Sequence, residues 1–182
     1  MRKLLALTLC IPALLLTSCA SPSKQLGNGF VPGCQMIRTG VESDKKLEIP
    51  CLDGQSTIDF HQIKGPIVIN LWGSWCEGCR EEMPYFIDLY ANPLFKSGQI
   101  QLLGIDVEET SKDAANNFIK NTGMSWPHLI DEADQTKSIF GPGVPVTWFI
   151  NETGKVVEQK IGAYQSKKDL FTQVEKAFGV KL

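Results

Sequence analysis

The sequence contains few histidines and no cluster of basic residues. Its 182 residues include only two histidines, His61 and His128, whereas a zinc site takes four ligands. The formal net charge is −2 and the basic residues form no cluster, which argues against a nucleic-acid partner. No apolar run approaches the roughly 20 residues that a membrane-spanning helix requires, and no segment repeats. The length is that of one globular domain with short additions.

The N-terminus has the pattern of a signal peptide. Two basic residues precede an apolar stretch over residues 4–16, which is too short to cross a bilayer as a helix. Leu16-Thr17-Ser18-Cys19 then matches the cleavage site of bacterial lipoproteins, where the cysteine thiol receives the lipid. We therefore expect a signal peptide over residues 1–18, lipidation of Cys19, and an extracytoplasmic protein anchored to the bacterial cell membrane. An ordinary secretory signal with an incidental cysteine is the alternative.

The rest of the chain divides into a tether and one domain. The start of residues 19–45 is rich in Ser, Pro, Gly and Asn and predicts a flexible tether, whereas a globular pattern covers residues 46–182. Alternating strand and helix patterns predict an α/β domain with a mixed sheet, helices on both faces and an N-terminal β extension. The expected strands cover residues 46–52, 56–60, 67–72, 99–107, 146–150 and 155–161, and the expected helices cover residues 77–91, 112–121 and 167–178.

Four of the six cysteines belong to the exported body, because Cys10 would leave with the signal peptide and Cys19 would carry lipid. An even number in an oxidising compartment indicates two disulfides. Cys76 and Cys79 are close neighbours, which leaves Cys34 to pair with Cys51. Closing the longer loop stabilises a fold by about 3 kcal/mol and the short ring by only about 2 kcal/mol. The longer bridge is therefore expected to be structural, and the short one to be redox-active.

The segment Trp75-Cys76-Glu77-Gly78-Cys79 directly follows the apolar run over residues 67–72. A strand that ends there and opens into a helix places the first sulfur at the helix N-terminus. Unpaired backbone N–H groups and the helix dipole favour a thiolate at that position. The second sulfur lies one turn further in, close enough to form a reversible disulfide.

With this segment, the chain resembles proteins of the thioredoxin fold, and among them the TlpA/ResA-like thiol–disulfide oxidoreductases. The resemblance rests on residues 70–84, 143–150 and 151–157, in the order and spacing of that family, and covers the chain from about residue 47 onward. It implies that Cys76 attacks a partner disulfide and that Cys79 resolves the mixed disulfide. It also implies that Pro145 is a cis-proline facing the dithiol, that Val144 pairs with the substrate backbone, and that Trp75 shields the Cys76 sulfur.

The chain departs from the family at two positions. Soluble thioredoxins carry a buried Asp at the position of Asn70, and because Asn cannot accept a proton, Glu82 is the candidate acceptor for Cys79. A solvated helix carboxylate is the alternative interpretation of Glu82. Most relatives have proline where this chain has Gly78, which loosens the turn and could alter the partner range. Glu77, also on the substrate side, disfavours the Cys76 thiolate and opposes the helix dipole.

The expected reaction is thiol–disulfide exchange by a monomer that needs no cofactor or metal. By resemblance, a membrane thiol-reductant protein of the CcdA/DsbD type would supply electrons, and exported proteins such as apocytochrome c would be reduced. The same residues could instead donate a disulfide, and the direction depends on the reduction potential. A copper-binding delivery module, a peroxidase and a purely structural lipoprotein are weaker alternatives.

Overall fold

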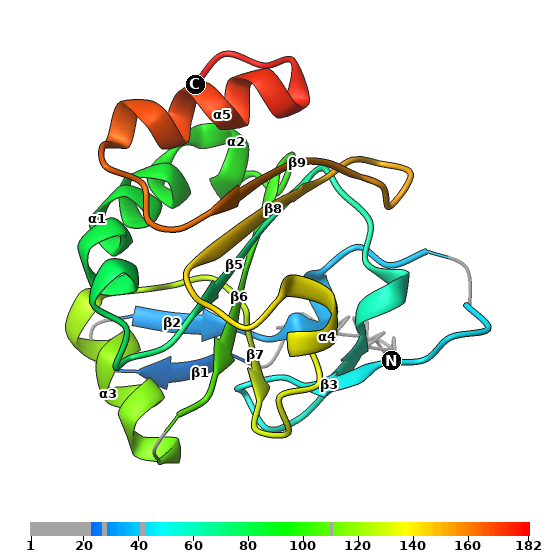
Figure 1. The fold of residues 1–182 in the computed structure, drawn as a ribbon, viewed down its shortest axis with the longest axis vertical. Helices are drawn as coiled ribbons and strands as arrows, with labels where there is room; N and C mark the ends of the chain where they lie inside the picture. Colours follow the sequence, from blue (N-terminus) through cyan, green and yellow to red (C-terminus); the bar gives the residue numbers. More distant parts are fainter. Residues whose placement is uncertain (1–22, 27–28, 41–42, 110) are drawn as a thin grey trace, which may run out of the picture.

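The computed structural model describes residues 23–26, 29–40, 43–109 and 111–182, and its centre is a five-stranded mixed sheet (Figure 1). The strand order is β7-β6-β5-β8-β9. β5 and β6 are parallel, as are β6 and β7, whereas β8 runs antiparallel to both β5 and β9. The strands are β5 (Ile67–Trp72), β6 (Gln101–Val107), β7 (His128–Asp131), β8 (Val146–Ile150) and β9 (Val156–Ile161).

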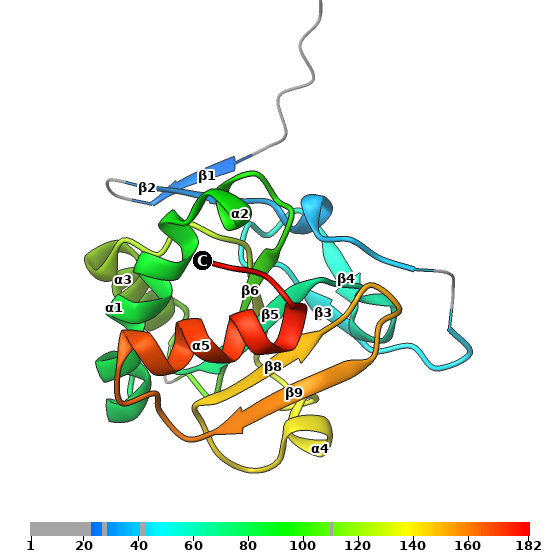
Figure 2. The same cartoon turned by 90° about the horizontal axis from the view of Figure 1, so that it is seen from above.

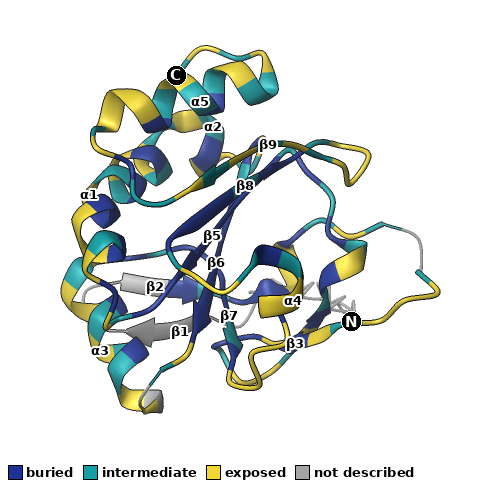
Figure 3. Ribbon diagram, in the orientation of Figure 1, coloured by how far each residue is buried: buried dark blue, intermediate teal, exposed yellow. Residues whose placement is uncertain are grey.

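Every residue of β5 is buried, because both faces of the sheet are covered. Val68 and Trp72 pack with α1 (Glu77–Ala91), α3 (Lys112–Thr122) and α5 (Lys167–Phe178) on one face. Ile67, Ile69 and Leu71 pack on the other face, with α4 (Lys137–Phe140) and the N-terminal segments. Figures 2 and 3 show these layers and the exposed outer faces of the helices. The expected thioredoxin-like α/β fold is confirmed.

Capping residues set the ends of two of these helices. The Ser111 and Ser166 side chains accept hydrogen bonds from the backbone N–H three residues later, so α3 and α5 begin there. Both helices end at glycines in the left-handed conformation, Gly123 and Gly179. These ends agree with the predicted helices to within a residue or two.

The chain before residue 46 differs from the predicted flexible tether. The described residues there form β1 (Ser23–Leu26), β2 (Gly29–Pro32) and a 3₁₀ turn, η1 (Cys34–Met36). Arg38 donates to the carbonyls of Pro66 and Gly98, both at 2.8 Å. Cys34 forms a disulfide with Cys51, and Cys34 and Ile37 are buried. The tether prediction rested on the polar composition of this segment. It therefore missed the few apolar residues that attach the segment to the domain.

The domain also contains short elements that the sequence patterns did not indicate. They are α2 (Pro93–Lys96), α4, β7 and the 3₁₀ turn η2 (Phe60–Gln62). The predicted N-terminal β extension is present as two shorter strands, β3 (Glu48–Pro50) and β4 (Thr57–Asp59). The predicted signal peptide and Cys19 lie outside the described residues. Within the described part of the chain, no helix has the length and apolar character needed to cross a membrane.

Candidate active site

The two cysteines of the motif form a disulfide at the start of α1. Cys76 is the N-cap residue, and its sulfur accepts a hydrogen bond of 3.1 Å from the backbone N–H of Cys79. Cys76 retains 6% of its surface accessible, whereas Cys79 is completely buried. The first sulfur therefore lies where a thiolate is favoured, on the less buried of the two cysteines, and the second lies further into α1.

The segment before β8 approaches the start of α1 closely. The Val144–Pro145 peptide bond is cis, as the resemblance implied. A Cβ atom placed on Gly78 would lie 3.5 Å from Pro145 Cδ and 3.3 Å from Ala163 Cβ. Gly78 therefore allows α1, the cis-proline and the turn after β9 to meet with little room between them.

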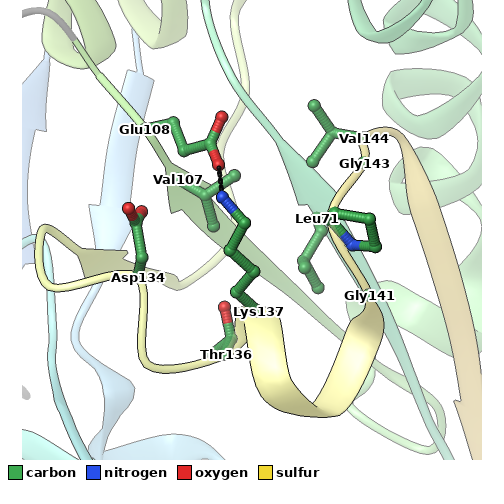
Figure 4. A pocket seen from close by; sticks show the side chains of 10 residues that line it. Leu71, Val107, Glu108, Asp134, Thr136, Lys137, Gly141, Gly143 and Val144 are labelled. Atoms are coloured by element: carbon green, nitrogen blue, oxygen red, sulfur yellow. Dashed lines mark hydrogen bonds and ion pairs between the residues drawn. The ribbon is translucent and has the colours of Figure 1, made fainter.

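A small pocket adjoins Val144 at the same edge of the sheet (Figure 4). Leu71 and Val107 line it from the ends of β5 and β6. An ion pair of 3.0 Å between Lys137 and Glu108 crosses it. The pocket next to Val144 is thus lined partly by apolar side chains and partly by an ion pair.

Trp75 is exposed to 49%, which is unusual for so large an apolar side chain. Its indole N–H donates to the carbonyl of Val107 at 3.4 Å, which tethers the ring to the end of β6. Glu77, in the first turn of α1, is also exposed. The surface around Cys76 therefore presents one large aromatic side chain and one acidic side chain.

Glu82 is buried on the side of α1 that carries Cys79, which excludes the interpretation of this residue as a solvated helix carboxylate. It lies three residues after Cys79, so the two side chains share one face of α1. Glu82 is completely buried, and its carboxyl accepts hydrogen bonds from Asn70 Nδ2 at 3.0 Å and from the backbone N–H of Tyr164 at 2.9 Å. It is not a solvated carboxylate like its exposed neighbour Glu81.

Burial raises the pKa of Glu82 to about 7, and this effect exceeds the opposing influence of its two hydrogen bonds and of Lys160. A carboxyl with this pKa exists in both protonation states near neutral pH. It is therefore able to accept or release a proton under the conditions in which thiols react.

Two residues that complete this site, Thr147 and Tyr164, were not identified from the sequence. Asn70 Nδ2 lies 3.3 Å from Thr147 Oγ1, and Tyr164 supplies its backbone N–H to Glu82. The pairing of Asn70 with Thr147 follows from the antiparallel register of β5 and β8. The signal for Thr147 was a polar residue inside an otherwise apolar strand, but Tyr164 acts through its backbone and leaves no sequence signal.

These features define a thioredoxin-like thiol–disulfide oxidoreductase: a dithiol at a helix N-terminus, a cis-proline against it, and a buried carboxyl beneath it. Comparison with known families agrees with this class. Residues 43–159 match the AhpC/TSA family, and the chain belongs to that family.

The similar curated proteins include thiol–disulfide oxidoreductases named ResA. The protein from Bacillus thuringiensis is 33% identical over 147 residues, which cover 80% of this chain and 82% of that protein. The protein from Bacillus subtilis is 36% identical over 107 residues, which cover 58% of each. The chain is therefore a thiol–disulfide oxidoreductase of the ResA type.

Solved structures with low sequence identity share the fold. A secreted Mycobacterium tuberculosis disulfide oxidoreductase, described as homologous to Escherichia coli DsbE, superposes with a TM-score of 0.62 at 19% identity, covering 72% of this chain and 96% of that one. An exposed lipoprotein thioredoxin from Streptococcus pneumoniae gives a TM-score of 0.57 at 22% identity, covering 72% and 99%.

Proposed function

We propose that this protein reduces disulfides of exported proteins outside the cytoplasm, with Cys76 as the attacking residue and Cys79 as the resolving residue. The observation that carries the proposal is the unequal exposure of the two cysteine residues at the start of α1. Only Cys76 retains accessible surface, and it lies at the position where a helix N-terminus favours a thiolate.

In the first step, the Cys76 thiolate attacks one sulfur of a partner disulfide. A mixed disulfide forms, the partner's S–S bond breaks, and the other partner sulfur leaves as a thiolate that takes a proton from solvent. An extended partner chain would pair with the Val144 backbone as a short added strand. Trp75 and the pocket beside Val144 would contact its side chains, and Glu77 and Gly78 would border it.

In the second step, Cys79 attacks the Cys76 sulfur and releases the partner's second thiolate. The Cys79 thiol must first lose its proton, and Glu82 is the proposed acceptor because its carboxyl lies one turn away with a pKa of about 7. Two electrons pass from the dithiol to the partner, and the Cys76–Cys79 disulfide is left oxidised.

The extracytoplasmic location is supported by the second disulfide. Cys34–Cys51 is buried and attaches the N-terminal segment to the domain, and bridges of this kind persist in oxidising compartments. In this proposal, residues 1–18 are a signal peptide, Cys19 carries the lipid, and the domain begins earlier than residue 46. A membrane thiol-reductant protein of the CcdA/DsbD type would return electrons to the dithiol, and apocytochrome c is the proposed client.

The reduction potential of the Cys76–Cys79 pair tests the direction of the reaction. It is measured by equilibration with glutathione or dithiothreitol mixtures, with Cys34–Cys51 left intact. A potential near that of thioredoxin, about −270 mV, is expected for a reductant. A potential near that of DsbA, about −120 mV, would overturn the proposed direction and make the protein a disulfide donor.

A further inference from the structure

An acidic residue beyond the end of β6 binds the loop that leads into the active site. The Glu109 carboxylate accepts hydrogen bonds from both donors of Ser74: the backbone N–H at 2.5 Å and the hydroxyl at 2.8 Å. Ser74 lies two residues before Cys76, and Glu109 lies 35 residues away in sequence. A carboxylate that accepts two hydrogen bonds from one residue fixes both the position and the orientation of that residue.

The same loop is held a second time by the end of β6. The Trp75 indole N–H donates to the carbonyl of Val107, two residues before Glu109. The Cys76 N–H in turn donates to the carbonyl of Gly73 at 3.1 Å, which closes the turn. The loop that carries Cys76 is therefore attached to β6 and its following segment on one side and to the first turn of α1 on the other.

A second carboxyl lies behind Glu109. Asp106 is the only charged residue in the apolar strand β6 and is almost completely buried. Burial and the neighbouring Glu109 raise the pKa of Asp106 to about 9, so Asp106 is protonated at neutral pH and does not repel Glu109. The other titratable residues lining the hollow at this edge are acidic: Glu108, Asp131, Glu132 and Asp134. Glu108 is engaged by Lys137, at 3.0 Å.

We infer that Glu109 is a positioning residue for thiol–disulfide exchange: it holds the loop over residues 73–75 so that the Cys76 sulfur stays against the N-terminal amides of α1. The contacts with Ser74 act on the orientation of that sulfur, and the negative charge of Glu109 acts on it separately. Orientation favours the thiolate, because the amides of the first turn donate to it. The charge disfavours the thiolate. The inference rests on the proposed attacking role of Cys76.

Two substitutions separate orientation from charge. Glu109→Gln removes the charge but keeps both contacts, since its amide oxygen accepts from the Ser74 N–H and its NH₂ group donates to the Ser74 hydroxyl. Glu109→Ala removes the charge and both contacts. Any difference between these two variants therefore reports the contacts alone.

The measurement is the pH dependence of alkylation of the fully reduced dithiol by iodoacetamide, with the modified cysteine identified by mass spectrometry. We expect the Cys76 thiol pKa in Glu109→Ala to exceed that in Glu109→Gln by about half a unit, the size of one helix-terminus interaction. Ser74→Ala, which keeps the charge and loses one contact, should also raise this pKa relative to the unmodified protein. Glu132→Ala, at an exposed acidic residue of the same hollow, is the control and should leave it unchanged.

Equal pKa values in Glu109→Ala and Glu109→Gln, together with no change in Ser74→Ala, would overturn the inference while leaving the proposed function intact. If Glu109→Ala does not fold, as judged by urea unfolding, Ser74→Ala against the unmodified protein decides the question. Alkylation of Cys79 ahead of Cys76 would instead overturn the proposed attacking role, and the inference with it.

Discussion

Replacing Glu82 by glutamine should make the folding stability of this protein less dependent on pH. Glu82 is completely buried, and burial holds its pKa at about 7 against a usual value of 4.5. Because the folded-state pKa is raised, the protonated carboxyl stabilises the fold. That contribution is fully present below about pH 4.5 and is lost as the pH rises through about 7.

The size of the effect follows from the two pKa values. A pKa rise from 4.5 to about 7 corresponds to about 3 kcal/mol at about 1.4 kcal/mol for each pH unit. Most of this loss falls between about pH 5 and about pH 8, where we expect Glu82 to cost the unmodified protein about 2–3 kcal/mol. A glutamine at this position stays neutral, and its amide oxygen can still accept the hydrogen bond from Tyr164 N–H.

The assay is urea unfolding of the oxidised protein at several pH values, with both disulfides intact. The relevant quantity is the difference in free energy of unfolding between Glu82→Gln and the unmodified protein, since the contribution of Asp106 cancels from it. This difference should shift in favour of the glutamine variant by about 2–3 kcal/mol from about pH 5 to about pH 8. Glu81→Gln, at the exposed neighbouring position, is the control and should show no such shift. A constant difference across this range would refute the assignment of a raised pKa to Glu82.

Three further predictions concern the cysteines and the packing of β6. Cys79→Ser should accumulate a stable mixed disulfide with a model disulfide protein, detected on non-reducing gels, because no resolving thiol remains; rapid turnover by this variant would contradict the assigned roles. Replacing both Cys34 and Cys51 by serine should lower the free energy of unfolding by about 3 kcal/mol in urea, from the lost loop closure; an unchanged value would show that this bridge does not stabilise the domain. Gly104→Ala places a Cβ atom 2.1 Å from His128 Nδ1 and should cost about 1–3 kcal/mol by overpacking. An unchanged thermal midpoint would contradict this.

The sequence predicted the central part of the fold well, because its patterns there are long and of one kind. The run Ile67–Trp72 is apolar at nearly every position and is buried on both faces, as in the prediction. The predicted helix over residues 77–91 coincides with α1 even though Pro84 lies inside it. β7 and α4 have four residues each, which is too short for a period to be recognised. Long-range attachment, such as that of Arg38 to Pro66, leaves no periodic signal either.

The sequence predicted the two cysteines of the candidate site but only some of its polar residues. The motif places Cys76 and Cys79 by local spacing, so the sequence alone locates them. Glu81 and Glu82 are adjacent acidic residues. They differ in that Glu82 lies on the side of α1 that packs on the sheet, whereas Glu81 is exposed. The buried residues Cys79, Met83 and Phe86 lie on the same side as Glu82, so a closer analysis of helical spacing would have favoured its burial. Asp106 could have been noticed as a lone charge in an apolar strand.

If Glu82 accepts the proton of Cys79 as proposed, the contacts of Asn70 explain how this chain functions without the buried aspartate of soluble thioredoxins. The carboxyl is carried by α1 instead of β5, and the Asn70 amide donates to it from the strand. An aspartate at position 70 would place two carboxyls within hydrogen-bond distance in a buried site, where one of them would have to stay protonated. Asparagine avoids that conflict and leaves one titrating group beneath Cys79. Because burial outweighs the two hydrogen bonds that Glu82 accepts, its pKa rises toward neutrality instead of falling, and a carboxyl that gains and loses its proton near neutral pH can exchange it with a thiol.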